Sequence, residues 1–202
     1  MQENYLRALV ITCLLVVFTI TPVWAASDMT PEKPHKWLRE ISLVTGYGTA
    51  SLEKKSSDYD IIPILPQIGF DINPLLEKMN ITPGGTLEFV IEPIVNVVIK
   101  PKANSEIGFS LLLNYSGNIT SRITPYIEGG LGAIHTTQNT HEQGTQYNFL
   151  SQVGAGLQFF LNDSFALKGG YRFRHMSNAG IDDDNSGINH HFVLVGLSYF
   201  FK

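Results

Sequence analysis

The feature of this sequence that most limits its fold is an alternation of apolar with polar or small residues that returns in eight segments. Successive side chains of an extended strand point to opposite faces, so a period of two predicts strands with one apolar and one polar face. The segments are 41–48, 61–70, 86–99, 107–115, 123–135, 147–159, 165–177 and 189–201. The second alternates poorly because it contains Pro63 and Pro66, and the connection 71–85 has room for a helical turn around 75–79.

Eight strands of about ten residues with this alternation are typical of an antiparallel transmembrane β-barrel, whose apolar faces touch lipid. A soluble β-sandwich also alternates, but it would place its charged faces in water and would not favour the many glycines on the polar faces. We expect charges to pair inside a narrow barrel that side chains fill. The sequence therefore predicts an all-β fold, an eight-stranded antiparallel transmembrane β-barrel. The charged residues predicted to point inward are Glu88, Glu92, Glu128, Lys168, Arg172 and Arg174.

The N-terminus has the layout of a secretory signal peptide, in which Arg7 precedes an apolar run over 8–20 and small residues follow at Ala25 and Ala26. We expect a signal peptide over 1–25 and a barrel domain over 26–202. The single cysteine, Cys13, lies in the signal peptide, so the mature domain has no thiol. A net charge of −4 without a basic run argues against a nucleic-acid partner. The histidines lack the spacing of metal ligands, so neither a metal nor a cofactor is expected.

A candidate catalytic pair lies at the end of the seventh segment, in the run Arg174-His175-Met176-Ser177-Asn178-Ala179-Gly180. His175 and Ser177 share the parity of the apolar face, where polar groups in contact with lipid are costly. A serine becomes a strong nucleophile when an adjacent base takes its proton, and that base needs a third group to orient it. An isolated His-x-Ser at a strand end is usually interfacial, but its lipid-facing parity favours a catalytic role here.

The eighth segment supplies a candidate third group. Antiparallel pairing across the connection 178–188 brings Asn189 near His175, and its amide oxygen can accept a hydrogen bond from the imidazole. Asn178 could donate a hydrogen bond to a developing oxyanion. The run 182–184 is an alternative source of the acid or of a Ca²⁺ ligand, but three consecutive aspartates are better explained as a solvated external loop.

The run 174–180, followed by Asn185-Ser186-Gly187 and a final strand, resembles the lipid A 3-O-deacylase (PagL-type) family of outer-membrane hydrolases. The stretch 87–93 and the glycine-rich strand after Pro125 are also similar to that family. The resemblance covers most of the mature chain. It implies an eight-stranded barrel that carries a His-Ser-Glu triad on its outer surface and removes the acyl chain ester-linked at position 3 of lipid A.

The resemblance also implies roles for individual residues. It makes His175 the base, Ser177 the nucleophile and Asn178 the oxyanion donor. The family's acid falls at Asn189, which is neutral in this chain. The implied protein is a cofactor-independent serine esterase of the cell outer membrane that acts on lipopolysaccharide.

Two other functions stay open. Outer-membrane phospholipase A also has a His-x-Ser followed by an Asn at similar spacing, so a phospholipase acting on outer-leaflet lipids is one alternative, although that family has a larger barrel than this chain can build. A non-enzymatic structural or adhesive barrel is the other. The sequence also leaves open whether the barrel forms a homodimer.

Overall fold

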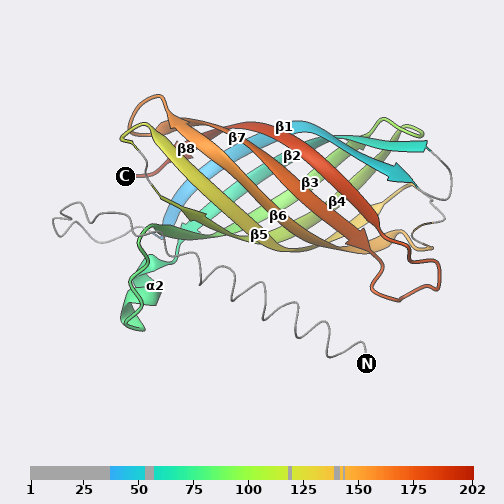
Figure 1. Ribbon diagram of the computed structural model, residues 1–202, viewed down its shortest axis with the longest axis horizontal. Coiled ribbons are helices and arrows are strands. Elements are labelled where there is room, and N and C mark those ends of the chain that lie inside the picture. Colours follow the sequence, from blue (N-terminus) through green and yellow to red (C-terminus); the bar gives the residue numbers. More distant parts are fainter. Residues whose placement is uncertain (1–36, 53–56, 118–119, 139–141, 143) are drawn as a thin grey trace. The chain divides into compact units, whose positions relative to one another are not determined.

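The computed structural model describes residues 37–52, 57–117, 120–138, 142 and 144–202. Over these residues the strands pair in sequence order and the last pairs with the first, which closes a barrel (Figure 1). Its strands are β1 (Leu38–Leu52), β2 (Ser57–Asp71), β3 (Thr86–Val98), β4 (Asn104–Ser116), β5 (Ile123–Thr136), β6 (Tyr147–Phe160), β7 (Phe165–Ser177) and β8 (Ile188–Phe200). The predicted eight-stranded antiparallel barrel is confirmed. The predicted signal peptide over 1–25 lies outside the described residues.

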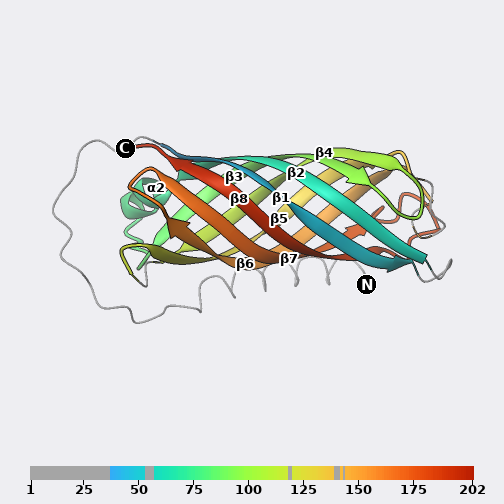
Figure 2. The same ribbon diagram turned by 90° about the horizontal axis from the view of Figure 1, so that it is seen from above.

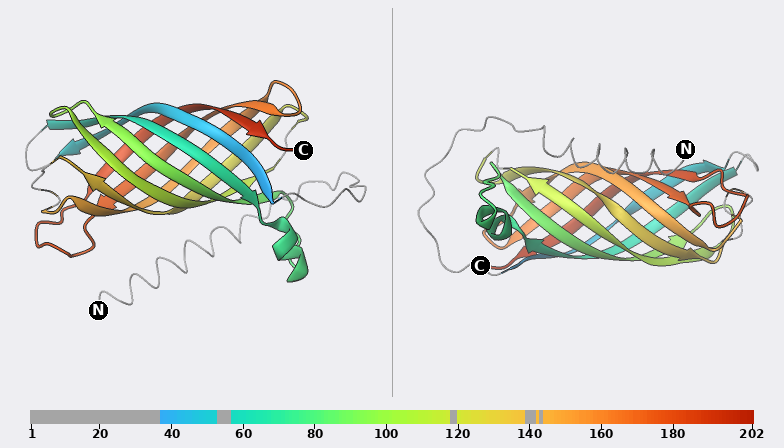
Figure 3. Two further views of the ribbon diagram at one scale, coloured as in Figure 1. Left: turned by 180° about the vertical axis from the view of Figure 1, so that it is seen from behind. Right: turned by 90° about the horizontal axis from the view of Figure 1, so that it is seen from below.

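Every neighbouring pair of strands is antiparallel, so the connections alternate between the two ends of the barrel. We call the end at which β1 begins and β8 ends the terminal end, and the opposite end, with the connections 99–103, 137–146 and 178–187, the loop end. Figures 2 and 3 show that the strands are inclined to the barrel axis. The short helix α2 (Asn73–Lys78) lies at the terminal end, in the long connection where a helical turn was expected (Figure 1). None of the helices in the described part of the chain has the length and apolarity of a transmembrane helix.

Strand β2 forms in spite of its prolines because its pairing is interrupted beside each of them, with β1 at Pro63 and with β3 at Pro66. The β2–β3 register runs from Ile61 to Ile64 and resumes at Ile68. Pro66 lies in this gap, where its missing N–H removes no ladder hydrogen bond on that side. The β2 side chains still alternate between buried and exposed on either side of the gap. The weakest of the predicted strands is therefore a full member of the barrel.

The outward faces of the strands are apolar, as the alternation predicts. Large apolar side chains are exposed on all eight strands, including Leu43, Ile64, Val95, Phe109, Leu131, Val153, Leu167 and Val193. Val193 is 70% exposed and Leu131 is 61% exposed. Such a continuous exposed apolar surface is unfavourable in water and is the expected surface of a barrel that contacts hydrocarbon. The barrel therefore spans a membrane.

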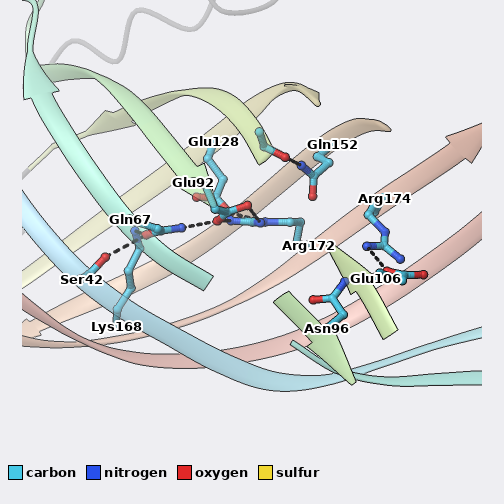
Figure 4. Close-up of polar contacts among 11 residues, drawn as sticks. Ser42, Gln67, Glu92, Asn96, Glu106, Glu128, Gln152, Lys168, Arg172 and Arg174 are labelled. Carbon is cyan, nitrogen blue, oxygen red and sulfur yellow. Dashed lines mark hydrogen bonds and ion pairs between the residues drawn. The ribbon is translucent and has the colours of Figure 1, made fainter. Parts of the chain in front are cut away.

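The inward faces carry a charged network at mid-barrel (Figure 4). The Arg172 guanidinium donates from Nη1 and Nη2 to the two carboxylate oxygens of Glu92, at 2.7 and 2.9 Å, and from Nε to Oε1 of Glu128 at 2.8 Å. Arg174 Nη1 donates to Oε2 of Glu106 at 3.1 Å. The two arginines therefore connect β7 to three other strands through the barrel interior. The six residues predicted to point inward, Glu88, Glu92, Glu128, Lys168, Arg172 and Arg174, are all buried.

Two of the six inward charges contact residues outside the predicted set. Lys168 Nζ donates to the Gln67 amide oxygen at 3.0 Å, and that oxygen also accepts from Ser42. Glu88 contacts Arg39, whose Nε lies 3.3 Å from its Oε1. The alternation placed six charges inward correctly, but it did not identify Gln67, Arg39 and the buried Glu106 as their partners.

The interior is not polar throughout, because apolar side chains are also buried at its loop end. Buried apolar residues gather there from seven strands, namely Leu52, Tyr59, Ile61, Val98, Ile134, Leu150, Met176 and Ile188. In these strands, the inward-facing positions that are small or polar in mid-barrel become apolar near the loop end. This apolar layer supports the strand ends that carry the candidate site.

Candidate active site

Strands β7 and β8 place the candidate residues on one outward surface at the loop end of the barrel. The two strands are antiparallel, with His175 directly opposite Asn189 in their register. The residues that flank His175 and Ser177 on the other parity, Arg174 and Met176, are buried in the barrel. His175 and Ser177 are half-buried and Asn189 is exposed. The predicted lipid-facing parity of these side chains is therefore confirmed.

His175 and Asn189 form a direct hydrogen bond, because Nδ1 of the imidazole lies 2.7 Å from the Asn189 amide oxygen. An amide oxygen can only accept, so Nδ1 carries the hydrogen and donates it. The other ring nitrogen, Nε2, is then unprotonated in the neutral ring and can accept a proton. Asn189 therefore fixes the imidazole in the tautomer that a general base requires.

Ser177 follows His175 by two residues on the same face of β7. Its Cβ lies about 7 Å from that of His175, from the rise of an extended strand. Among the described residues, the structure joins His175 to Asn189 by a hydrogen bond but shows no hydrogen bond between His175 and the Ser177 hydroxyl. Across the other edge of β7, Ser177 is opposite Phe149 and His175 is opposite Ser151 of β6.

Gly187 contacts the imidazole ring and was not identified from the sequence as a site residue. Its φ is +75°, a left-handed conformation that glycine adopts without strain. A Cβ placed on Gly187 would lie 2.6 Å from Cε1 and 3.2 Å from Nε2 of His175. The main chain at the end of the β7–β8 loop therefore packs directly against the ring, where any side chain would displace it.

Asn178 is placed differently from the oxyanion donor that the sequence predicts. Its side chain is completely buried, and its amide nitrogen donates to the main-chain oxygens of Asp182 and Asp184, at 3.2 and 3.1 Å. Its amide oxygen accepts from the Gly180 N–H at 2.8 Å, and its own N–H donates to Asn185 Oδ1. Asn178 therefore organises the loop 178–187, and this geometry does not support a direct contact with substrate.

In the part of the chain that the structure describes, His175 forms its side-chain hydrogen bond with Asn189 and none with the acidic run of the same loop. Asp182, Asp183 and Asp184 are exposed, and Asp182 Oδ1 accepts from the Asp184 N–H at 3.0 Å within a tight turn. The Nδ1 position of His175 that an acid would contact is occupied by Asn189. Among the described residues, no group of three or more His, Cys, Asp or Glu side chains is arranged to hold a metal ion.

The surface around the site is apolar on the β6 side and toward mid-barrel. Phe149 and Val153 of β6 are 49% and 59% exposed, and Phe173 is half-buried opposite Val153. One further polar contact lies on this wall, where the Tyr171 hydroxyl is 2.6 Å from Nδ1 of His191. A substrate that reaches Ser177 along this wall would do so with a hydrocarbon chain.

Comparison with known proteins points to one family. The family model described as lipid A 3-O-deacylase (PagL) matches residues 68–198. The solved structure of the outer membrane enzyme PagL is 21% identical, with a TM-score of 0.55, over 78% of this chain and 97% of that chain. Neisserial surface protein A (NspA) is 14% identical, with a TM-score of 0.60, over 81% of this chain and 97% of that chain. At these identities the structural likeness shows the barrel fold alone. The comparison with curated proteins gives no match.

Proposed function

The chain belongs to the lipid A 3-O-deacylase (PagL) family, and from this premise we propose that it is an outer-membrane serine esterase that removes the acyl chain ester-linked at position 3 of lipid A. The observation that carries the proposal is the 2.7 Å hydrogen bond between His175 and Asn189 on a membrane-facing surface. Ser177 lies two residues after His175 on the same face of β7. Polar groups are costly on a surface that contacts lipid, so their presence there indicates a function. The site faces the lipid rather than the barrel interior, so its substrate is a lipid.

The proposed reaction has two halves. Nε2 of His175 takes the hydroxyl proton as Ser177 Oγ attacks the ester carbonyl carbon, and the carbonyl electron pair moves to oxygen. The tetrahedral intermediate then expels the sugar 3-oxygen, which takes the proton from His175, and leaves an acyl-Ser177 ester. Water attacks this ester in the same way, with His175 as base, and releases the fatty acid. The only other reactant is water, so the reaction requires no cofactor.

Asn189 has a narrower role than the acid of a His-Ser-Glu triad. Its amide oxygen orients the ring and selects the tautomer, but a neutral group stabilises the imidazolium less than a carboxylate does. We therefore expect a slower chemical step than a carboxylate would give. The geometric requirement of a base held by a third group is still met.

The barrel resides in the outer membrane, which is where lipid A is found and where the family's barrels reside. We propose that the loop end faces the cell exterior, with the termini on the periplasmic side. The connections 137–146 and 178–187 at the loop end are longer than 117–122 and 161–164 at the terminal end, as is usual for external loops, and the long connection 72–85 departs from this pattern. In this orientation Ser177 lies near the outer interface, at the depth of the ester bonds that join acyl chains to the sugars of outer-leaflet lipid.

Mass spectrometry of lipid A tests the proposal. Cells that express the protein should show lipid A lighter by one ester-linked acyl chain from position 3, and cells that express Ser177→Ala should not. Ser105→Ala is a matched control, because Ser105 is half-buried on β4 opposite the exposed Val97 and lies away from β7. Unchanged lipid A with the wild-type protein would contradict the deacylase function.

A phospholipase is the second candidate, because the third group at position 189 is an asparagine rather than an acid. The same cells distinguish the two functions when phospholipids and lipid A are analysed together. Loss of acyl chains from phospholipids alone would support the phospholipase, whereas no change in either lipid would support a non-enzymatic barrel.

A further inference from the structure

Attack on an ester creates a negatively charged oxygen that needs hydrogen-bond donors, and removing one such donor typically slows an acyl-transfer enzyme about 10²–10³-fold. The nearest candidate in sequence, Asn178, donates both of its side-chain contacts to main-chain oxygens of its own loop. The donor that completes the site should therefore come from another part of this surface.

The main-chain N–H groups of the β7–β8 loop are also engaged at several positions. Those of Gly180, Ile181 and Asp184 donate within the loop, to Asn178 Oδ1, the Asn178 carbonyl and Asp182 Oδ1. The Ser186 N–H donates to the Glu142 carbonyl of the β5–β6 loop. These contacts hold the loop in shape beside His175 and turn these donors away from the strand surface.

Strand β6 supplies a hydroxyl group beside His175, on the strand surface from which these loop donors are turned away. Ser151 is directly opposite His175 in the β6–β7 register, and it is half-buried on the same outward face. Directly opposite residues of an antiparallel pair have Cβ atoms about 4.5–5.5 Å apart, and diagonal neighbours such as Ser151 and Ser177 are about 7–8 Å apart. An ester carbonyl attacked by Ser177 therefore lies within reach of the Ser151 hydroxyl.

The contacts of the His175 imidazole leave the β6 side of the site for the substrate. Nδ1 of His175 is bonded to Asn189 on β8, and Gly187 packs against Cε1. The β8 side and the loop side of the ring are therefore occupied. These two contacts leave the β6 side, over Ser151 and next to Ser177, for the approach of the reacting carbonyl.

We propose that Ser151 is a further catalytic residue, which donates its hydroxyl hydrogen to the oxyanion formed when Ser177 attacks the ester; this rests on the proposed esterase function. The hydrogen bond forms as the carbonyl electron pair moves onto oxygen, and it is released when the C=O bond reforms and the sugar oxygen leaves with the proton from His175. Beyond Ser151 the wall is apolar, with the exposed Leu131 opposite it on β5. A donor in such a low-dielectric setting stabilises charge more strongly than it would in water.

Steady-state kinetics with the refolded full-length protein in detergent micelles test the role. With p-nitrophenyl myristate as the probe ester, Ser151→Ala should lower kcat about 10²-fold with little change in KM, because the donor acts on the transition state. Ser151→Thr retains the hydroxyl and should recover most of the rate, while Ser105→Ala should behave like the wild type. Heat-modifiable electrophoretic mobility of each variant confirms that the barrel is folded. Wild-type kcat in folded Ser151→Ala, or no recovery in folded Ser151→Thr, would overturn the proposal.

Labelling with a long-chain alkyl fluorophosphonate separates this proposal from the esterase function itself. Ser177 Oγ forms a bond to phosphorus and fluoride leaves, with negative charge developing on the phosphoryl oxygen, so no lipid turnover is required. Peptide mass spectrometry should find the adduct on Ser177, formed more slowly in Ser151→Ala and at the wild-type rate in Ser105→Ala. An adduct on Ser151 would make it the nucleophile and overturn the proposal, and equal labelling rates would do so as well. Absence of any adduct on Ser177 in the wild type would instead reject the esterase function.

Discussion

Asn189 is the residue at which this site departs from a triad with an acid. Its contact with His175 through an amide oxygen at 2.7 Å supplies orientation without charge. Asn189→Ala should therefore lower kcat less than His175→Ala does, and Asn189→Glu should hold or raise it by stabilising the imidazolium. Deacylation rates of the folded variants check this order. A larger loss in Asp182→Ala than in Asn189→Ala would show that a loop aspartate is the third group.

Gly187 gives a prediction that separates steric contact from backbone strain. A Cβ at this position would lie 2.6 Å from the His175 ring, so Gly187→Ala should displace the imidazole and lower kcat while the barrel stays folded. Gly180→Ala is the matched control, because its φ of +84° imposes similar strain but a Cβ there meets nothing within 4 Å. Comparison of kcat in the two variants isolates the contact. Equal effects of the two substitutions would mean that the loop, and not the ring contact, determines the rate.

Some of these residue-level features could be predicted from the sequence, and others could not. The face of His175 and Ser177 follows from strand parity, and their approach to Asn189 follows from antiparallel pairing. The hydrogen bonds of Asn178 depend on how the loop folds back on itself, which no period in the sequence encodes. The β6–β7 register that brings Ser151 to His175 depends on the geometry of the tight turn 161–164, which the alternation does not specify.

At the scale of elements, β7 has two separate functions on its two faces. Outward it carries the candidate site, and inward it carries Arg172 and Arg174, which bind acids of other strands. The inward contacts fix the rotation of the strand and therefore the direction in which His175 and Ser177 point. The network thus stabilises the site without taking part in its chemistry.

The network gives a prediction about stability. Glu92 is completely buried and accepts two hydrogen bonds from Arg172, so Glu92→Gln leaves part of a buried charge uncompensated, at a cost of about 3–5 kcal/mol. The temperature at which electrophoretic mobility shifts should fall, while kcat below that temperature should stay the same. Lys202→Gln removes an exposed contact with Asp163 and should change little. Loss of activity in folded Glu92→Gln at low temperature would point to a site inside the barrel.

Most elements were predictable because alternation is a strong local signal. All eight strands and the helical turn near 75–79 appear where the sequence places them, although β1 extends from 38 to 52 rather than from 41 to 48. Its added residues at the loop end, Thr49 and Ser51, are polar on the outward face, which hides the apolar alternation. The apolar layer inside the loop end was missed for the opposite reason, because Leu150 and Met176 are apolar on a parity that is polar elsewhere.

At the scale of the whole barrel, the exposed apolar surface predicts how the protein behaves in isolation. It should fractionate with outer membranes, and it should run at a different electrophoretic mobility before and after boiling, because a closed barrel has no free strand edge at which detergent can begin to unfold it. Gel mobility of membrane fractions checks both expectations. Recovery as a soluble periplasmic protein would contradict the membrane assignment.

The filled interior, with its charged network and apolar layer, has a consequence for kinetics. Because the candidate site faces lipid and no lipid can pass through the barrel, the proposed enzyme and its lipid substrate meet by lateral diffusion within one leaflet. The relevant substrate concentration is then the mole fraction of lipid A in the membrane, rather than its amount per volume of solution. Diluting lipid A with inert phospholipid in the same vesicles should therefore slow turnover, even when the bulk concentration of lipid A is unchanged.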